Sequence, residues 1–97
     1  MLRFFLLNPD HSHKEVTLVT YSSLSRGSVQ LADETVEGCR VSTIFLGIAA
    51  GDMFLYETMV FGPEETMYQH SRKYETYDEA MQGHKETVAN VKYHFMR

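Results

Sequence analysis

The chain has 97 residues, a net charge of −4 and a single cysteine, Cys39. This length predicts one domain over residues 1–97, and a hydrophobic content of 43% with 12% aromatic residues excludes a disordered chain. The nine lysines and arginines are scattered, which disfavours nucleic-acid binding through phosphate contacts, and one cysteine excludes an internal disulfide and is typical of a reducing cytosol.

The N-terminal third is predicted to form β-structure. Residues 3–7 contain an apolar run that is too short for a signal-peptide core or a membrane span, and we expect a strand buried on both faces. Asn8-Pro9-Asp10 has the residue types of a turn. The β-branched alternation of residues 14–23 predicts a second strand, and residues 28–32 predict a short third strand or a sheet edge.

Two apolar runs of similar length follow, at residues 39–48 and 53–62. They are joined by a short segment centred on Gly51-Asp52, which predicts an antiparallel hairpin. In residues 62–75, Gly62 is followed by Pro63, Glu64 and Glu65, residue types that favour the first turn of a helix. We therefore expect a single helical turn or a mobile loop there.

The periodicity of the sequence changes at residue 76. Thr76-Tyr77-Asp78-Glu79 has the form of a capping box. The residues that follow at helical spacing on one side are Tyr77, Ala80, Met81, His84, Val88, Val91 and Phe95. They predict an amphipathic helix of about five turns. Gly83 costs such a helix about 1 kcal/mol relative to alanine, which predicts that a strand or a ligand approaches the helix backbone closely there.

The predicted fold is therefore α+β: an antiparallel sheet of four or five strands with one long C-terminal helix packed on one face. Apolar residues occur on both faces of the expected hairpin, and one helix covers only one of them. We therefore expect a homodimer or a higher symmetric oligomer.

The seam between sheet and helix is the main candidate site. If the hairpin turns around residues 50–51, Thr43 and Glu57 share one face and meet His84. The functional interpretation is a pocket that binds a small polar ligand through Glu57 and His84. The structural interpretation is a buried pair of Glu57 and His84 that fixes the helix to the sheet. The candidate ligand-binding residues are Arg40, Ser42, Thr43, Glu57, Thr58, Tyr77 and His84.

Other chemical patterns are weak. His11 and His13 are two residues apart beside a turn, with no Cys-x-x-Cys or His-x-x-x-His motif, so the sequence predicts no metal site and no cofactor. Neither a nucleophile motif nor a phosphate-binding glycine pattern is present. A nucleotide-like ligand held between subunits could still contact Arg26, Arg40, Arg72 and Lys73.

Three segments together resemble a group of small proteins of tailed bacteriophages: VSTIFLG at 41–47, YETMVFG at 56–62 and YETYDEAMQGH at 74–84. Those proteins typically carry a VSTVFLG-like strand, an FETMVFGG-like strand and a YSTWEEAxxGH helix start. The resemblance covers roughly residues 38–92 and implies a phage origin and a host-cell cytoplasmic setting. The chain departs from the group at residues 48–52, where the group often has a longer loop with an Asp-His pair.

These observations predict a non-enzymatic phage accessory protein that counters host defence by binding a nucleotide-like signalling molecule or a host protein, with no membrane partner. One alternative is a small hydrolase or nucleotide-processing enzyme that uses Glu57 and His84 as acid and base. Another is a structural or assembly protein of the virion.

Overall fold

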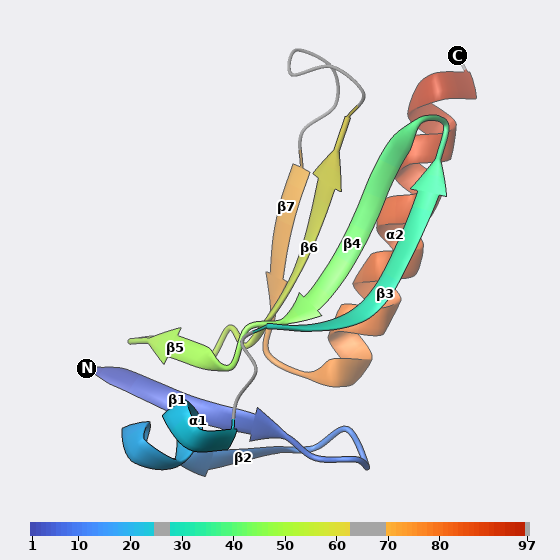
Figure 1. Ribbon diagram of the computed structural model, residues 1–97. Helices are drawn as coiled ribbons and strands as arrows, with labels where there is room; N and C mark the ends of the chain where they lie inside the picture. The colour runs from blue at the N-terminus through green and yellow to red at the C-terminus, as the bar shows by residue number, and fades with distance from the viewer. Residues whose placement is uncertain (25–27, 63–69, 97) are drawn as a thin grey trace.

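The computed structural model describes residues 1–24, 28–62 and 70–96 and shows an α+β fold, as predicted (Figure 1). Its elements in chain order are β1 (Leu2–Leu7), β2 (His13–Val16), α1 (Leu18–Leu24), β3 (Val29–Val36), β4 (Cys39–Phe45), β5 (Ile48–Ala50), β6 (Tyr56–Phe61), β7 (His70–Tyr74) and α2 (Tyr77–Met96). The strands form two antiparallel sheets, ordered β2-β1-β5 and β3-β4-β6-β7, rather than one.

The predicted antiparallel pairing of residues 39–61 is confirmed, because β4 pairs with β6. The connection between the two strands is not a simple turn, however. Residues 48–50 leave to form β5, which pairs with β1 in the second sheet. Gly47 makes this departure possible, since its φ is +78° and the backbone of Phe5 lies against it, with the Phe5 amide donating to the Gly47 carbonyl at 2.8 Å.

The N-terminal segment differs from the predicted pair of strands. The strand expected over residues 14–23 is wrong beyond Val16, because Thr17 caps a short helix instead: the amide of Thr20 donates to its hydroxyl at 3.2 Å. The β-branched pattern was a weak guide to local structure, since β propensity depends on having a sheet surface to pack against. In β1 only Phe5 is buried, so the expected burial on both faces is also wrong.

Residues 70–74, expected to belong to a loop or a helical turn, form the edge strand β7. This polar segment lacks an apolar alternation, and the backbone ladder to β6 defines the strand, with Glu57 opposite Lys73. The helical turn expected at residues 63–65 lies outside the described residues.

Helix α2 begins where the capping box predicts. The amide of Glu79 donates to the Thr76 hydroxyl at 3.2 Å, and that hydroxyl donates to the Glu79 carboxylate at 3.0 Å. The helix lies along one face of the four-stranded sheet (Figure 1). The close approach predicted at Gly83 is confirmed: the ring of Tyr74 on β7 occupies the space that a Cβ atom would need.

Candidate functional site

A polar layer crosses the interior between two apolar layers. On one side of it lie Phe45, Tyr56 and Ala80, and on the other side lie buried valines of β4, β6 and α2. The layer itself consists of Thr43 on β4, Thr58 on β6 and His84 on α2, with 0%, 0% and 2% of their surfaces exposed. Buried polar side chains of this kind are stable only when their hydrogen bonds are satisfied.

The hydrogen bonds of this layer form one continuous chain. The Thr43 Oγ1 atom lies 2.5 Å from Thr58 Oγ1 and 2.7 Å from His84 Nδ1, and His84 Nε2 lies 2.9 Å from Glu34 Oε1. An ionised carboxylate only accepts, so Nε2 donates to Glu34. In a neutral imidazole Nδ1 then accepts from the Thr43 hydroxyl, which in turn accepts from Thr58.

A hydroxyl, an imidazole and a carboxylate in series have the connectivity of a catalytic triad. The burial of both threonines rules out that use in this conformation, since no substrate carbonyl can reach a hydroxyl with no exposed surface. The hydrogen-bond chain therefore links α2 to β3, β4 and β6. This agrees with the structural interpretation of the seam, except that the acid is Glu34 and not Glu57.

The predicted meeting of Glu57 with His84 is wrong. Thr43 pairs with Thr58 across the β4–β6 ladder, and Ile44 pairs with Glu57. Glu57 therefore points to the sheet face opposite α2, where the Ser71 hydroxyl donates to its carboxylate at 2.8 Å. A shift of one residue in pairing reverses every side chain of a strand, so a small error in register removed the expected pocket.

Two other predicted site residues also lie on the face away from α2. The Arg40 Nε atom donates to Asp33 Oδ1 at 2.9 Å, and Gln30 donates to the Ser42 hydroxyl at 3.1 Å. Thr58 points to the opposite face and belongs to the buried chain. Six of the seven candidate residues are thus divided between the two sides of one sheet, and the candidates do not form a single site.

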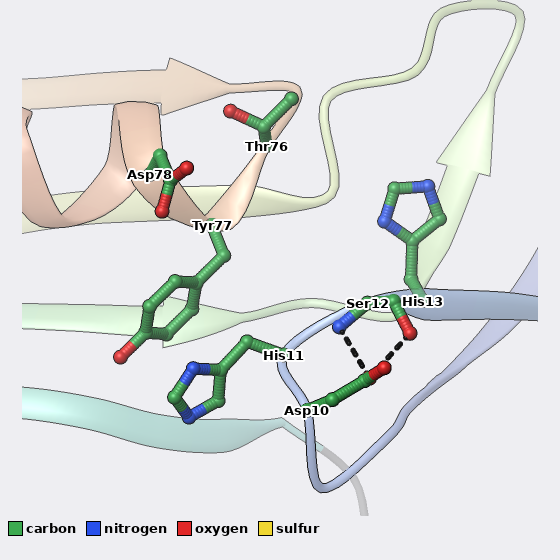
Figure 2. Close-up of a pocket in the computed structure, with 7 residues that line it drawn as sticks. All are labelled: Asp10, His11, Ser12, His13, Thr76, Tyr77 and Asp78. Carbon is green, nitrogen blue, oxygen red and sulfur yellow. Dashed lines mark hydrogen bonds between the residues drawn. The ribbon is translucent and has the colours of Figure 1, made fainter.

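Tyr77, the remaining candidate, lies at the start of α2 and stacks on His11 with the ring centroids 4.0 Å apart. These rings line a hollow of about 420 Å³ between the β1–β2 turn and the helix start. Figure 2 shows the residues that surround it. Asp10 accepts from the hydroxyl and the backbone amide of Ser12 there, which lowers the pKa of its carboxyl. The lining residues are Asp10, His11, Ser12, His13, Thr76, Tyr77 and Asp78. Within the described ranges, no three histidine, cysteine or acidic residues are placed to hold a metal.

The arginines do not converge on a phosphate site in the part of the chain that the structure describes. Arg3 pairs with Glu15, Arg40 with Asp33 and Arg72 with Glu86, at nitrogen–oxygen distances between 2.7 and 3.0 Å. Arg40 and Arg72 also lie on opposite faces of the sheet, because their partners on β6, Phe61 and Thr58, point to opposite faces. Arg26 lies outside the described residues.

These exposed ion pairs predict acid sensitivity. Hydrogen bonds from arginine lower the pKa values of Glu15, Asp33 and Glu86 in the folded protein. When the pKa of a carboxyl is lower in the folded state than in the unfolded state, the ionised carboxyl stabilises the fold at any pH above the unfolded-state pKa of about 4. That stabilisation is lost as the pH falls through the folded-state pKa. The melting temperature should therefore fall steadily below about pH 4. Calorimetric scans from pH 7 to pH 2 would measure this, and a melting temperature independent of pH would contradict it.

Glu34 is the site residue that the sequence interpretation missed. The third strand was expected to end at residue 32, whereas β3 continues to Val36. Within that longer strand Ala32, Glu34 and Val36 alternate with Asp33 and Thr35, which places Glu34 on the face that packs against α2. The sequence feature that could have identified Glu34 is its spacing of two residues from both Ala32 and Val36, which puts all three on one face of a strand.

Comparisons with protein-family models, with curated proteins and with solved structures found no match to this chain. Across the described residues, neither helix is both long and apolar enough to span a membrane.

Proposed function

We propose that this chain is a non-enzymatic phage accessory protein that binds a host protein in the host cytoplasm, counters a host defence and acts as a homo-oligomer. The observation that carries the proposal is the face of the four-stranded sheet opposite α2, here called the open face. Its members are Asp33, Thr35, Arg40, Ser42, Ile44, Glu57, Met59, Phe61, Ser71 and Lys73.

The composition of the open face suits a protein surface. Phe61 is 47% exposed, and half-buried Met59 lies two residues before it on β6. Half-buried Ile44 lies further along the neighbouring strand β4, opposite Glu57. Two acids and two basic residues surround them, so the face carries no net charge. Protein interfaces combine an apolar, aromatic or methionine-rich centre with a polar rim in this way.

A protein partner is better supported than a nucleotide because the arginines described above are already paired with carboxylates. The threonines and the histidine of the threonine–histidine–glutamate chain are buried, so the chain gives no support to the hydrolase alternative. Glu57 and His84 are also separated by the sheet. The proposed phage origin still rests on the resemblance of residues 38–92.

A second candidate is a small planar ligand in the hollow of Figure 2, where the stacked His11 and Tyr77 rings offer an aromatic surface. Asp10 and Asp78 line the same hollow and would repel the phosphates of a nucleotide. A neutral or cationic ring is the chemistry that this hollow favours.

The test is affinity capture from bacterial cells, compared between wild type and Phe61→Asp. We expect wild type to retain a host protein at a fixed stoichiometry and Phe61→Asp to lose at least 90% of it, about a tenfold effect, because a charge replaces an exposed aromatic anchor. Lys85→Asp, an exposed change on α2, is the control and should retain the partner. Equal capture by all three proteins would contradict the proposal, and a thermal shift with a small planar ligand that is lost in Tyr77→Ala would favour the hollow instead.

A further inference from the structure

The two outer strands of the four-stranded sheet carry opposite charges. Strand β3 bears Asp33 and Glu34 and has no lysine or arginine, whereas β7 bears Arg72 and Lys73 and has no acid. The two strands lie at opposite edges of the sheet (Figure 1). Each edge has backbone groups that can pair with a further strand, which is a common route to association.

The charges also match face by face. Asp33 and Lys73 both lie on the open face, since they pair with Ser42 and Glu57. Glu34 and Arg72 both lie on the face toward α2, where they contact His84 and Glu86. An acid–base couple is therefore present on each side of the sheet, although Asp33 and Arg72 also have ion-pair partners, Arg40 and Glu86, within the chain.

We propose that copies of this chain associate head to tail, with β3 of one copy pairing antiparallel with β7 of the next and Asp33 opposite Lys73. The same register places Glu34 opposite Arg72 and Thr35 opposite Ser71, so both couples form at once. Residues directly opposite in an antiparallel pair point to the same face, which both couples satisfy. Asp33 and Glu34 have side chains 40% and 53% exposed, so both are accessible for this contact.

The strand directions and the backbone hydrogen bonds are compatible with this register. The four strands alternate in direction, so copies in the same orientation present β7 and β3 antiparallel, with every α2 on one side. Hydrogen-bonded and non-hydrogen-bonded pairs alternate along strands and across a sheet. Along the row Asp33–Ser42–Met59–Ser71, this alternation makes the backbone N–H and C=O groups of residues 33, 71 and 73 either all point out of the sheet edge or all point into the sheet. Asp33 and Lys73 can therefore form a regular antiparallel pair across the junction.

Two-fold pairing of identical edges is disfavoured, because β3 against β3 brings acids together and β7 against β7 brings basic residues together. The head-to-tail contact instead closes into a ring or continues as an open array. This inference rests on the homo-oligomer part of the proposed function and makes no use of a host partner.

The first test measures mass by light scattering and native mass spectrometry over a wide range of protein concentration at low salt. We expect wild type to associate, and Asp33→Lys and Lys73→Asp each to weaken association about tenfold or more, because each places like charges opposite one another. The exchanged variant carrying both substitutions should associate again, and an equal mixture of the two single variants should do so too. Lys85→Asp is the control with the same change in charge as Lys73→Asp.

Lys73→Asp keeps the test valid if Asp33→Lys fails to fold, since Asp33 also pairs with Arg40. A wild type that stays monomeric at every concentration would overturn the proposal. Association that is unaffected by either single substitution, or that the exchange does not restore, would overturn it as well.

A second test checks the register by oxidation. A mixture of Thr35→Cys and Ser71→Cys chains should form disulfide-linked dimers in high yield, whereas Thr35→Cys with Lys85→Cys should not; the native Cys39 is buried and does not interfere. Equal yields from both mixtures would overturn the register.

The two proposals can fail separately. If association fails while Phe61→Asp still abolishes host-protein capture, only the assembly proposal is lost. If association occurs while no host protein is captured, the assembly proposal stands and the proposed function is lost.

Discussion

Gly83→Ala should destabilise the protein by roughly 1–3 kcal/mol, although alanine in place of glycine normally stabilises a helix by about 1 kcal/mol. The sign is reversed because a Cβ atom at this position would overlap the ring and the hydroxyl of Tyr74. Tyr74 is buried in the core and Arg72 lies over its ring, so the ring has little room to move away. Urea denaturation of wild type and variant would measure the change.

Two controls separate this overlap from an ordinary helix effect. Ala89→Gly, at an exposed position of α2, should cost about 1 kcal/mol and gives the local scale of helix propensity. Gly83→Ala should be less harmful in a Tyr74→Leu background, because the smaller side chain leaves room for the new methyl group. If Gly83→Ala were stabilising in wild type, the close packing of β7 on α2 would be refuted.

Thr43→Val should lower the free energy of unfolding by roughly 1–3 kcal/mol, and by more than Thr58→Val does. Thr43 is the central member of the buried chain, so its loss leaves both His84 Nδ1 and the Thr58 hydroxyl without their partners. Thr58→Val removes only the terminal hydroxyl and leaves the bond between Thr43 and His84 in place. Equilibrium unfolding of both variants would give the order of the two costs.

The double variant Thr43→Val/Thr58→Val sharpens this prediction. It should be less destabilised than Thr43→Val alone, because only one buried polar atom then lacks a partner instead of two. Strict additivity of the two single changes would show that the threonines do not act as one network.

The unequal success of the sequence interpretation follows from the range of the interactions involved. The start of α2 was predicted because the Thr76 cap and its Glu79 partner are three residues apart and act locally. The consequence of Gly83 was predicted because glycine inside an amphipathic helix needs a reason from packing. Strand β7 was missed because its polar residues carry no apolar alternation and its position depends on the ladder to β6.

The candidate site failed as a prediction because of register. The residue types of the buried layer were recognised, since Thr43, Thr58 and His84 were all named, but Glu57 was placed on the wrong face. Pairing Thr43 with Thr58 instead of Glu57 is a shift of one residue, and the spacing of the two strands in sequence does not distinguish the two. The true acid, Glu34, comes from a strand fifty residues before His84.

The amino-acid sequence by itself determined the α+β class, the strand pair at residues 39–61 and the helix that begins after Thr76, because hydrophobic period and capping chemistry are local properties. Only the tertiary structure decided the division into two sheets, the choice of Glu34 as the partner of His84 and the opposite charges of the two sheet edges. Those features depend on which strands become neighbours and in which register, and backbone hydrogen bonding alone does not specify either. They are selected when the whole chain buries its apolar faces and satisfies its buried polar groups together.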